Sequence, residues 1–137
     1  MTISFDGKVC VVTGAGNGLG RCHALALAER GAKVVVNDLG GARDGTGASS
    51  KAADTVVDEI IKNGGEAFSH GANVTNYEEV VDMIKQTMKR WGRIDVLINN
   101  AGILRDKSFS KMELSDFKLV LDVHLMGSVN CTKAVWD

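Results

Sequence analysis

A glycine-rich turn is the first place in this sequence where residue types and spacing predict chemistry. Residues 13–20 read Thr-Gly-Ala-Gly-Asn-Gly-Leu-Gly and follow a run of β-branched residues. Glycines at such a turn accept positive φ values, and without Cβ atoms a pyrophosphate can approach the backbone. Free N–H groups and the dipole of a helix beginning there would supply the anion site. Taken alone, the turn is compatible with a phosphate site or with an ordinary loop.

Asp38 adds a second observation, because it stands at the end of the next predicted strand. An acid about 20 residues beyond such a turn is placed to hold the adenine ribose hydroxyls of a dinucleotide. A carboxylate that only caps the following loop is the alternative. A 2′-phosphate about 4 Å away would be repelled by several kcal/mol at an effective dielectric near 20. Asp38 therefore predicts NAD, while Arg43 in the next loop is interpreted as a solvated residue rather than as a sign of NADP.

The elements that must position these residues alternate between short apolar strands and amphipathic helices. Strands are predicted at 8–13, 33–37, 66–74 and 94–98, and a flexible loop at 40–50. Helices are predicted from near 18 to 30, from 52 to 63, after a capping box at Thr75-x-x-Glu78, and from about 115 to the C-terminus. Such buried strands alternating with helices indicate an α/β fold, a Rossmann-type doubly wound parallel sheet. We predict one domain over residues 1–137, with element order βαβαβαβα and strand order 3-2-1-4.

Two helices show apolar faces that are expected to pack. In the third helix the face consists of Val80, Val81, Ile84, Met88 and Trp91, and in the last helix of Phe117, Val120, Leu121, His124 and Leu125.

Composition excludes several classes of protein. The chain is 45% hydrophobic and 24% charged, with a formal net charge of -1, as is typical of soluble globular domains. This balance gives no electrostatic argument for nucleic acid, and no apolar run predicts a membrane segment. The three cysteines are widely spaced and are interpreted as apolar residues in a reducing compartment, the cytoplasm. His23 and His70 lack partners at metal-ligand spacing, so no metal is predicted.

The motif Thr-Gly-x-x-x-Gly-x-Gly, together with Asn99-Asn100-Ala101-Gly102 after the fourth strand, resembles the short-chain dehydrogenase/reductase family along the whole chain. The resemblance implies that Thr13 braces the second motif. It also implies a cofactor-binding set around NAD, with an amide at Asn73 where the family has an acid near adenine. This set comprises Gly14, Asn17, Gly18, Leu19, Gly20, Asp38, Leu39, Asn73, Val74, Asn100, Ala101 and Gly102.

Longer stretches, VVVNDLGG at 34–41 and NNAGILRDKSFS at 99–110, resemble the (3R)-hydroxyacyl-CoA dehydrogenase units of peroxisomal multifunctional enzymes and their bacterial relatives. This resemblance implies a small-molecule substrate, an acyl-CoA, and NAD-dependent oxidation of 3-hydroxyacyl-CoA to 3-ketoacyl-CoA in fatty-acid metabolism. It adds the peroxisomal matrix as an alternative compartment. Two other functions stay open: a 3-ketoacyl-carrier-protein reductase, which generally has a basic residue in place of Asn17, and a non-catalytic nucleotide-binding or interaction module.

The family's catalytic Tyr-x-x-x-Lys is not found in these residues. The only tyrosine is Tyr77, which is followed four positions later by Val81, and packing is its expected role. We therefore predict no catalytic residue here and expect the 137-residue chain alone to be inactive, with the Ser and the Tyr/Lys pair beyond Asp137. His124 replaces the Asn of the family's Asn-Leu-x-Gly stretch. It is interpreted either as a satisfied core residue or as a support for the proton relay.

Self-association is the last expectation from the sequence. If the chain stops at Asp137, the apolar strand 94–98 becomes a sheet edge and the last helix loses its cover. Relatives in the family generally pair this helix with a second subunit. A homo-oligomer formed through residues 115–135, or aggregation, is therefore expected.

Overall fold

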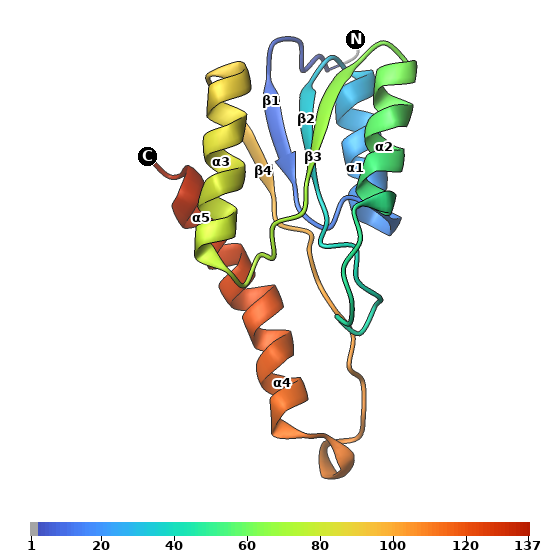
Figure 1. Cartoon of the computed structure of the whole chain (residues 1–137), viewed down its shortest axis with the longest axis vertical. Coiled ribbons are helices and arrows are strands. Elements are labelled where there is room, and N and C mark those ends of the chain that lie inside the picture. The colour runs from blue at the N-terminus through green and yellow to red at the C-terminus, as the bar shows by residue number, and fades with distance from the viewer. Residues whose placement is uncertain (1–2) are drawn as a thin grey trace.

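The computed structural model describes residues 3–137, which contain a four-stranded sheet. Figure 1 shows helices on both sides of this sheet. The strands are β1 (Val9–Val12), β2 (Lys33–Asn37), β3 (Glu66–His70) and β4 (Val96–Ile98). The helices are α1 (Gly18–Glu29), α2 (Lys51–Lys62), α3 (Tyr77–Trp91), α4 (Leu114–Leu121) and α5 (Gly127–Val135). A 3₁₀ turn, η1 (Phe109–Lys111), precedes α4, and a π turn, η2 (Asp122–Met126), joins α4 to α5.

The sheet is entirely parallel and has the order β3-β2-β1-β4, which confirms the predicted strand order. In register, Cys10 of the central strand β1 pairs with Val34 on one side and with Val96 on the other. Because all strands run the same way, their carboxyl ends meet at one edge. The loops that follow β1, β2, β3 and β4 therefore gather there (Figure 1).

Two hydrophobic layers enclose the sheet. On one face α1 and α2 pack against side chains such as Val12, Val34 and Val36. On the other face α3 and α5 pack against Val11, Val35 and others. Successive residues of β1 and β2 thus point to opposite layers and, apart from Lys33 at the start of β2, are buried, which explains why these strands read as continuous apolar runs.

Two strands are shorter than the sequence predicted. Strand β3 ends at His70 rather than at position 74, because Asn37 Nδ2 donates to the carbonyls of both His70 and Ala72 and the chain leaves the ladder there. Strand β4 begins at Val96, because Asp95 uses its carboxylate to accept from Val9 N at 2.9 Å.

Helix α3 begins one residue later than the predicted capping box. Its N-cap is Asn76, whose Oδ1 accepts from the N–H groups of Glu78 and Glu79, whereas Thr75 donates its hydroxyl to Asn73. The buried face is also rotated. Met83 and Thr87 are fully buried, while Val81 is half-buried and Met88 is 45% exposed.

The last predicted helix exists, but the π turn divides it. One extra residue in η2 shifts the face that follows, so that Gly127 and Cys131 of α5 are buried against the α3 side of the sheet. Gly127 meets the Val74 side chain, and a Cβ there would lie 2.6 Å from Val74 Cγ2. Within residues 3–137 no helix combines the length and the apolar character needed to cross a bilayer.

Candidate functional site

A cavity of about 380 Å³ lies beyond the carboxyl ends of the strands. In open parallel sheets ligands bind at this edge, where the order of connections reverses beside the first strand. The glycine turn, the ends of β2 and β3, the Asn100 loop and α4 all contribute walls. The lining consists of Gly14, Asn17, Gly18, Asn37, Asp38, Leu39, Gly41, Ala42, Arg43, Gly45, Ala72, Asn73, Val74, Thr75, Asn100, Ala101, Gly102, Ile103, Leu119 and Val123.

A wider hollow of about 1120 Å³ lies at the opposite end of the sheet, near Arg30, Lys33, Glu59 and Glu66. Its charges have mixed sign, and the C-terminal ends of α1 and α2 reach it. A helix C-terminus carries negative partial charge and does not attract an anionic cofactor. The smaller cavity is therefore the candidate site.

The glycine turn is fastened to the loop after β4, as the resemblance implied. Thr13 Oγ1 accepts from the N–H groups of Asn100 and Ala101, each at 3.0 Å. In return, Asn100 Nδ2 donates to the carbonyls of Thr13 and Gly14, each at 3.1 Å. Thr13 is 1% exposed, so these bonds are made where water cannot replace them.

Two glycines of the turn are required by close approach. A Cβ on Gly20 would collide with the Gly14 carbonyl and with Asn100 Nδ2, so the helix could not approach the loop. A Cβ on Gly16 would lie 2.7 Å from Asp38 Oδ2. Gly20 is buried and Leu19 is 72% exposed, and neither lines the cavity. All the other residues of the predicted cofactor-binding set do.

The N-terminus of α1 is open toward the cavity. Asn17, the N-cap, makes no side-chain capping bond, and the first turn carries no acid. The first backbone bond joins Arg21 N to Asn17 O, so the N–H groups before it have no helical partner. Helix α3 is the contrast, because Asn76 caps it and acids occupy its first turn. An anion is therefore favoured at α1 and not at α3.

Asp38 is held rigidly at the edge of the cavity. Its Oδ2 accepts from Gly16 N at 2.8 Å and its Oδ1 from Gly40 N at 2.7 Å. The carboxylate thus bridges the glycine turn and the start of the β2–α2 loop. Asp38 therefore does cap the following loop, at Gly40 N, as the alternative interpretation predicted. Asp38 also lines the cavity. Each carboxylate oxygen keeps a second lone pair for another donor.

The wall formed by Asn73 and Val74 is fixed by side chains around it. Asn73 N donates to Glu79 at 2.7 Å, and Asn130 of α5 donates to the Val74 carbonyl at 2.9 Å. His70 Nδ1 accepts from Ala72 N, while its Nε2 lies 2.9 Å from Asp82. The hydrogen bond from His70 lowers the pKa of the Asp82 carboxyl below its ordinary value.

The loop at 40–50 lacks regular structure, as predicted, but it is held in place. Leu104 N donates to the Arg43 carbonyl at 2.7 Å, and Arg105 Nε donates to the Asp44 carbonyl at 2.7 Å. Arg43 is exposed, as expected, and also lines the cavity. Sequence reasoning did not assign Gly41, Ala42, Gly45 or Ile103 to the site, because their contribution depends on this contact between two distant loops.

His124 is carried by the π turn and is not a core residue. The ring is exposed and lies over Gly102, where a Cβ would stand 2.7 Å from His124 Cε1. Its Nε2 is 3.0 Å from Ile103 N and 2.9 Å from Ile103 O. One ring nitrogen either accepts or donates, so the imidazole serves one of these two groups at a time. The expectation that His124 is a satisfied core residue is therefore wrong. The exposed ring instead contacts the loop that contains Gly102 and Ile103.

Tyr77 is the first residue of α3 and is 44% exposed. It does not line the cavity, although Thr75 nearby does. Nothing in its position links it to the candidate site, in keeping with the absence of a lysine four residues later.

Known proteins are similar in sequence to almost the whole chain. Peroxisomal multifunctional enzyme type 2 from Drosophila melanogaster is 57% identical over 98% of this chain, which covers 22% of that protein. A 3-oxoacyl-[acyl-carrier-protein] reductase from Synechocystis is 52% identical over 93% of this chain, which covers 49% of it. The chain thus spans half or less of these relatives.

The same holds in three dimensions. The solved structure of a 7α-hydroxysteroid dehydrogenase complexed with NADH and 7-oxo glycochenodeoxycholic acid superposes with a TM-score of 0.85 at 32% identity. The match covers 96% of this chain and 48% of that one. The family model described as short chain dehydrogenase matches residues 8–137. The parallel sheet and the hydrogen bonds between the glycine turn and the loop after β4 agree with this match. The chain belongs to the short-chain dehydrogenase family.

Proposed function

We propose that this chain binds NAD in the cavity at the carboxyl ends of the strands and forms the cofactor half of an NAD-dependent oxidoreductase. One observation carries the proposal: a fixed carboxylate, Asp38, stands beside the N-terminus of α1, where the N-cap residue Asn17 makes no side-chain capping bond. A dinucleotide needs both, an anion site for its pyrophosphate and an acceptor for its ribose hydroxyls.

The residues present fit this cofactor. A Cβ on Gly18, which lines the cavity, would have no atom within 4 Å, so the backbone there is open to close approach by a ligand. Gly14 instead lets the loop after β4 pack against the turn. In the proposal, the N–H groups that open α1 hold the pyrophosphate, and Asp38 with Leu39 holds the adenine ribose. Asn73 and Val74 then flank adenine, and Asn100, Ala101 and Gly102 extend along the dinucleotide. Gly20 serves by packing, since it is enclosed by Gly14 and Asn100.

The chemistry that NAD would supply in this site is that of a hydride acceptor. We propose a 3-hydroxyacyl-CoA as the substrate, oxidised at C3 to the ketone with release of the hydroxyl proton. The longer sequence stretches and the 57% identity to the Drosophila multifunctional enzyme support this substrate class. These residues position the cofactor, and none of them is proposed to accept the proton. The relative's name also supports the peroxisomal matrix as the compartment, beside the cytoplasm.

Cofactor preference tests the proposal. Fluorescence titration should show that NADH binds more tightly than NADPH, because a 2′-phosphate near Asp38 would be repelled. Asp38→Ala should weaken the binding of NADH and reduce the preference for NADH over NADPH. Asp58→Ala on α2 is the matched control, since it removes an exposed carboxylate that does not line the cavity. An unchanged NADH/NADPH ratio in Asp38→Ala would show that the ribose assignment is wrong.

A 3-ketoacyl-carrier-protein reductase is the second candidate, and the 52% identity to the Synechocystis reductase favours it. The two functions differ in substrate carrier and in direction. Assays of the full-length protein with 3-hydroxyacyl-CoA and NAD, and with 3-ketoacyl-carrier protein and NADPH, separate them. The first pair should be the faster.

We also propose that the protein is a homo-oligomer through α4 and α5. Phe117, Leu121, Leu125 and Val129 recur along one exposed stripe, each between 43% and 58% exposed. A groove of about 450 Å³ on α5 continues it to Trp136. Contiguous exposed apolar residues of this kind mark association. Light scattering should show a dimer or larger species, and Leu125→Lys should reduce the mass. Exposed Ile61→Lys on α2 is the control, and a monomeric wild type would contradict the proposal.

A further inference from the structure

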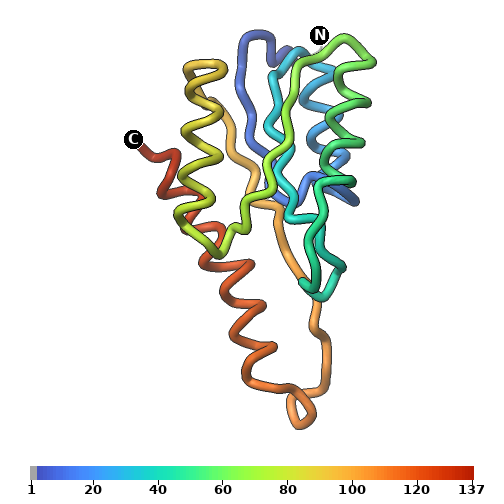
Figure 2. Tube along the Cα trace, viewed as in Figure 1, coloured from blue at the N-terminus to red at the C-terminus, as the bar shows by residue number. Residues whose placement is uncertain are grey.

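Two loops that are far apart in the sequence lie side by side over the cavity. The loop 40–50 follows β2, and the segment 103–105 follows β4 (Figure 2). Leu104 N donates to the Arg43 carbonyl at 2.7 Å. A Cβ on Gly45 would come within 3.2 Å of the Ile103 side chain. Gly45 and Ile103 both line the cavity, so this junction forms part of its wall.

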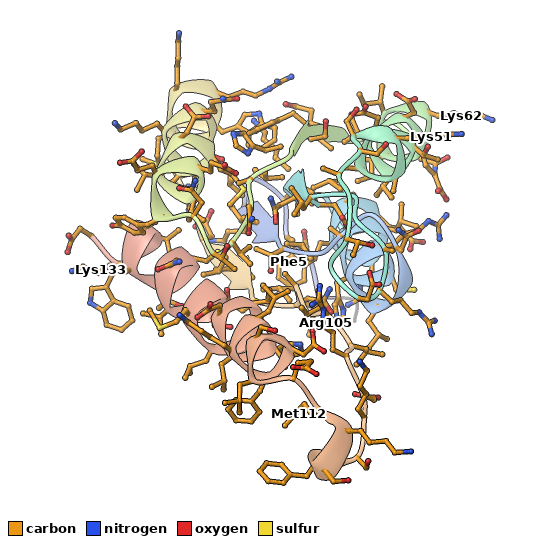
Figure 3. The ribbon with its side chains drawn as sticks, turned by 60° about the horizontal axis from the view of Figure 1, so that its bottom comes forward. Phe5, Lys51, Lys62, Arg105, Met112 and Lys133 are labelled. Atoms are coloured by element: carbon orange, nitrogen blue, oxygen red, sulfur yellow. The ribbon has the colours of Figure 1, made fainter. Side chains whose placement is uncertain are left out.

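Arg105 fastens the junction with a single guanidinium. Its Nε donates to the Asp44 carbonyl at 2.7 Å, and its Nη1 donates to Asp116 Oδ1 on α4 at 2.6 Å. Figure 3 shows Arg105 between the loop and that helix. The two side chains are 24% and 14% exposed, so the ion pair is largely shielded from water. Because water competes less for such shielded, charge-assisted hydrogen bonds, the pair holds its geometry.

The two anchors of Arg105 belong to opposite walls of one cavity. Asp44 lies between Arg43 and Gly45, which line one wall. Asp116 stands one helical turn before Leu119, which lines the other. Neither wall is part of the sheet, so the sheet alone does not fix the distance between them. Arg105 is the side chain that joins them.

We propose that Arg105 is a positioning residue that holds the β2–α2 loop closed over the dinucleotide cavity by tying it to α4. This inference rests on the proposed NAD site for its effect on binding. Loss of Arg105 lets the loop open, and the bound dinucleotide leaves faster. The association rate changes less, because the anion site at α1 is untouched.

Two measurements on the purified protein test this proposal. Stopped-flow fluorescence with NADH should show an increase of about tenfold in the dissociation rate of Arg105→Ala. Limited trypsin digestion without NADH, followed by mass spectrometry, should show faster cleavage after Arg43, because a protease needs the loop open. The melting temperature should change little, since both hydrophobic layers are intact.

Two further variants separate positioning from charge. Arg105→Lys keeps the charge near Asp116, but one ammonium cannot reproduce a forked guanidinium bonded to two groups, so it should resemble Arg105→Ala. Lys107→Ala removes the other cation near Asp116, at 3.7 Å, and leaves the loop contact in place. It should match wild type in both assays.

Full recovery by Arg105→Lys, or unchanged Arg43 cleavage in Arg105→Ala, would overturn the inference. If wild type binds no NADH, the proposed function fails, and the cleavage assay still decides whether Arg105 holds the loop.

Discussion

Thr13 and Asn100 hydrogen-bond each other in both directions across 87 positions of sequence. The hydroxyl of Thr13 accepts from the Asn100 N–H, and the Asn100 amide donates to the Thr13 carbonyl. The glycine turn is therefore shaped by the loop after β4 as well as by its own glycines. Any change in either residue should alter both loops.

Thr13→Val should reduce both stability and NADH affinity. Valine has nearly the same shape, but it leaves the N–H groups of Asn100 and Ala101 without their acceptor. A buried unsatisfied group costs about 1–3 kcal/mol. Urea denaturation and NADH titration measure the two effects. Thr87→Val is the control: Thr87 is also fully buried, but its hydroxyl only donates to the Met83 carbonyl within a helix. It should leave NADH affinity unchanged.

Acid should destabilise the protein partly through Asp95. The Arg93 guanidinium and the Val9 N–H lower the pKa of this carboxyl from 3.8 to about 2. Because the folded pKa is the lower one, the stabilisation is complete above about pH 5. It is lost as the pH falls through 3.8 toward 2. Asp95→Asn should flatten the decline in unfolding free energy below pH 5, whereas exposed Asp58→Asn should not. Equal slopes in both variants would contradict the assignment.

One cysteine should react in the folded protein. Burial raises the pKa of Cys10 and of Cys131 to about 11, Asp95 also contributing at Cys10, and both side chains are fully buried. The thiolate is the reactive form, and at pH 8 it amounts to about one part in a thousand of such groups. Cys22 on α1 is exposed. A thiol reagent should therefore label one group in native protein, three after denaturation, and none in native Cys22→Ser.

His124→Gln should bind NADH at least as well as wild type, and His124→Leu should bind several-fold more weakly. The glutamine amide can accept from Ile103 N and donate to Ile103 O together, whereas the imidazole serves one of them. Exposed His23→Gln on α1 is the control. If His124→Leu binds NADH as tightly as His124→Gln does, His124 does not position the loop that contains Ile103.

The sequence predicted what depends on local pattern. Strand β2 has its predicted ends, and the strand order follows from right-handed connections between alternating strands and helices. The capping residue of α3 was predicted one position early because Thr75 and Asn76 are both good caps. Thr75 is instead bonded to Asn73, and only the turn before the helix shows this.

The features that were missed depend on contacts between distant segments. Glycines and small polar residues made 40–50 read as flexible, but its backbone carbonyls at Arg43 and Asp44 are bonded by residues some 60 positions away. The π turn likewise has no local signature. It satisfies two constraints at once, His124 over Gly102 and Gly127 against Val74.

The pair of hydrogen bonds between Thr13 and Asn100, here called the staple, also sets an order of events during folding. The contact between Gly16 and Asp38 closes 22 positions, whereas the staple closes 87 and costs about 1 kcal/mol more in loop-closure entropy. A growing chain emerges from the ribosome N-terminus first. Strands β1 and β2 and helix α1 can therefore pack together before Asn100 has been translated. The glycine turn acquires its final shape only after β4 has docked. Nucleotide binding is thus a late event in the folding of this chain, and NADH would select molecules in which β4 is already paired with β1.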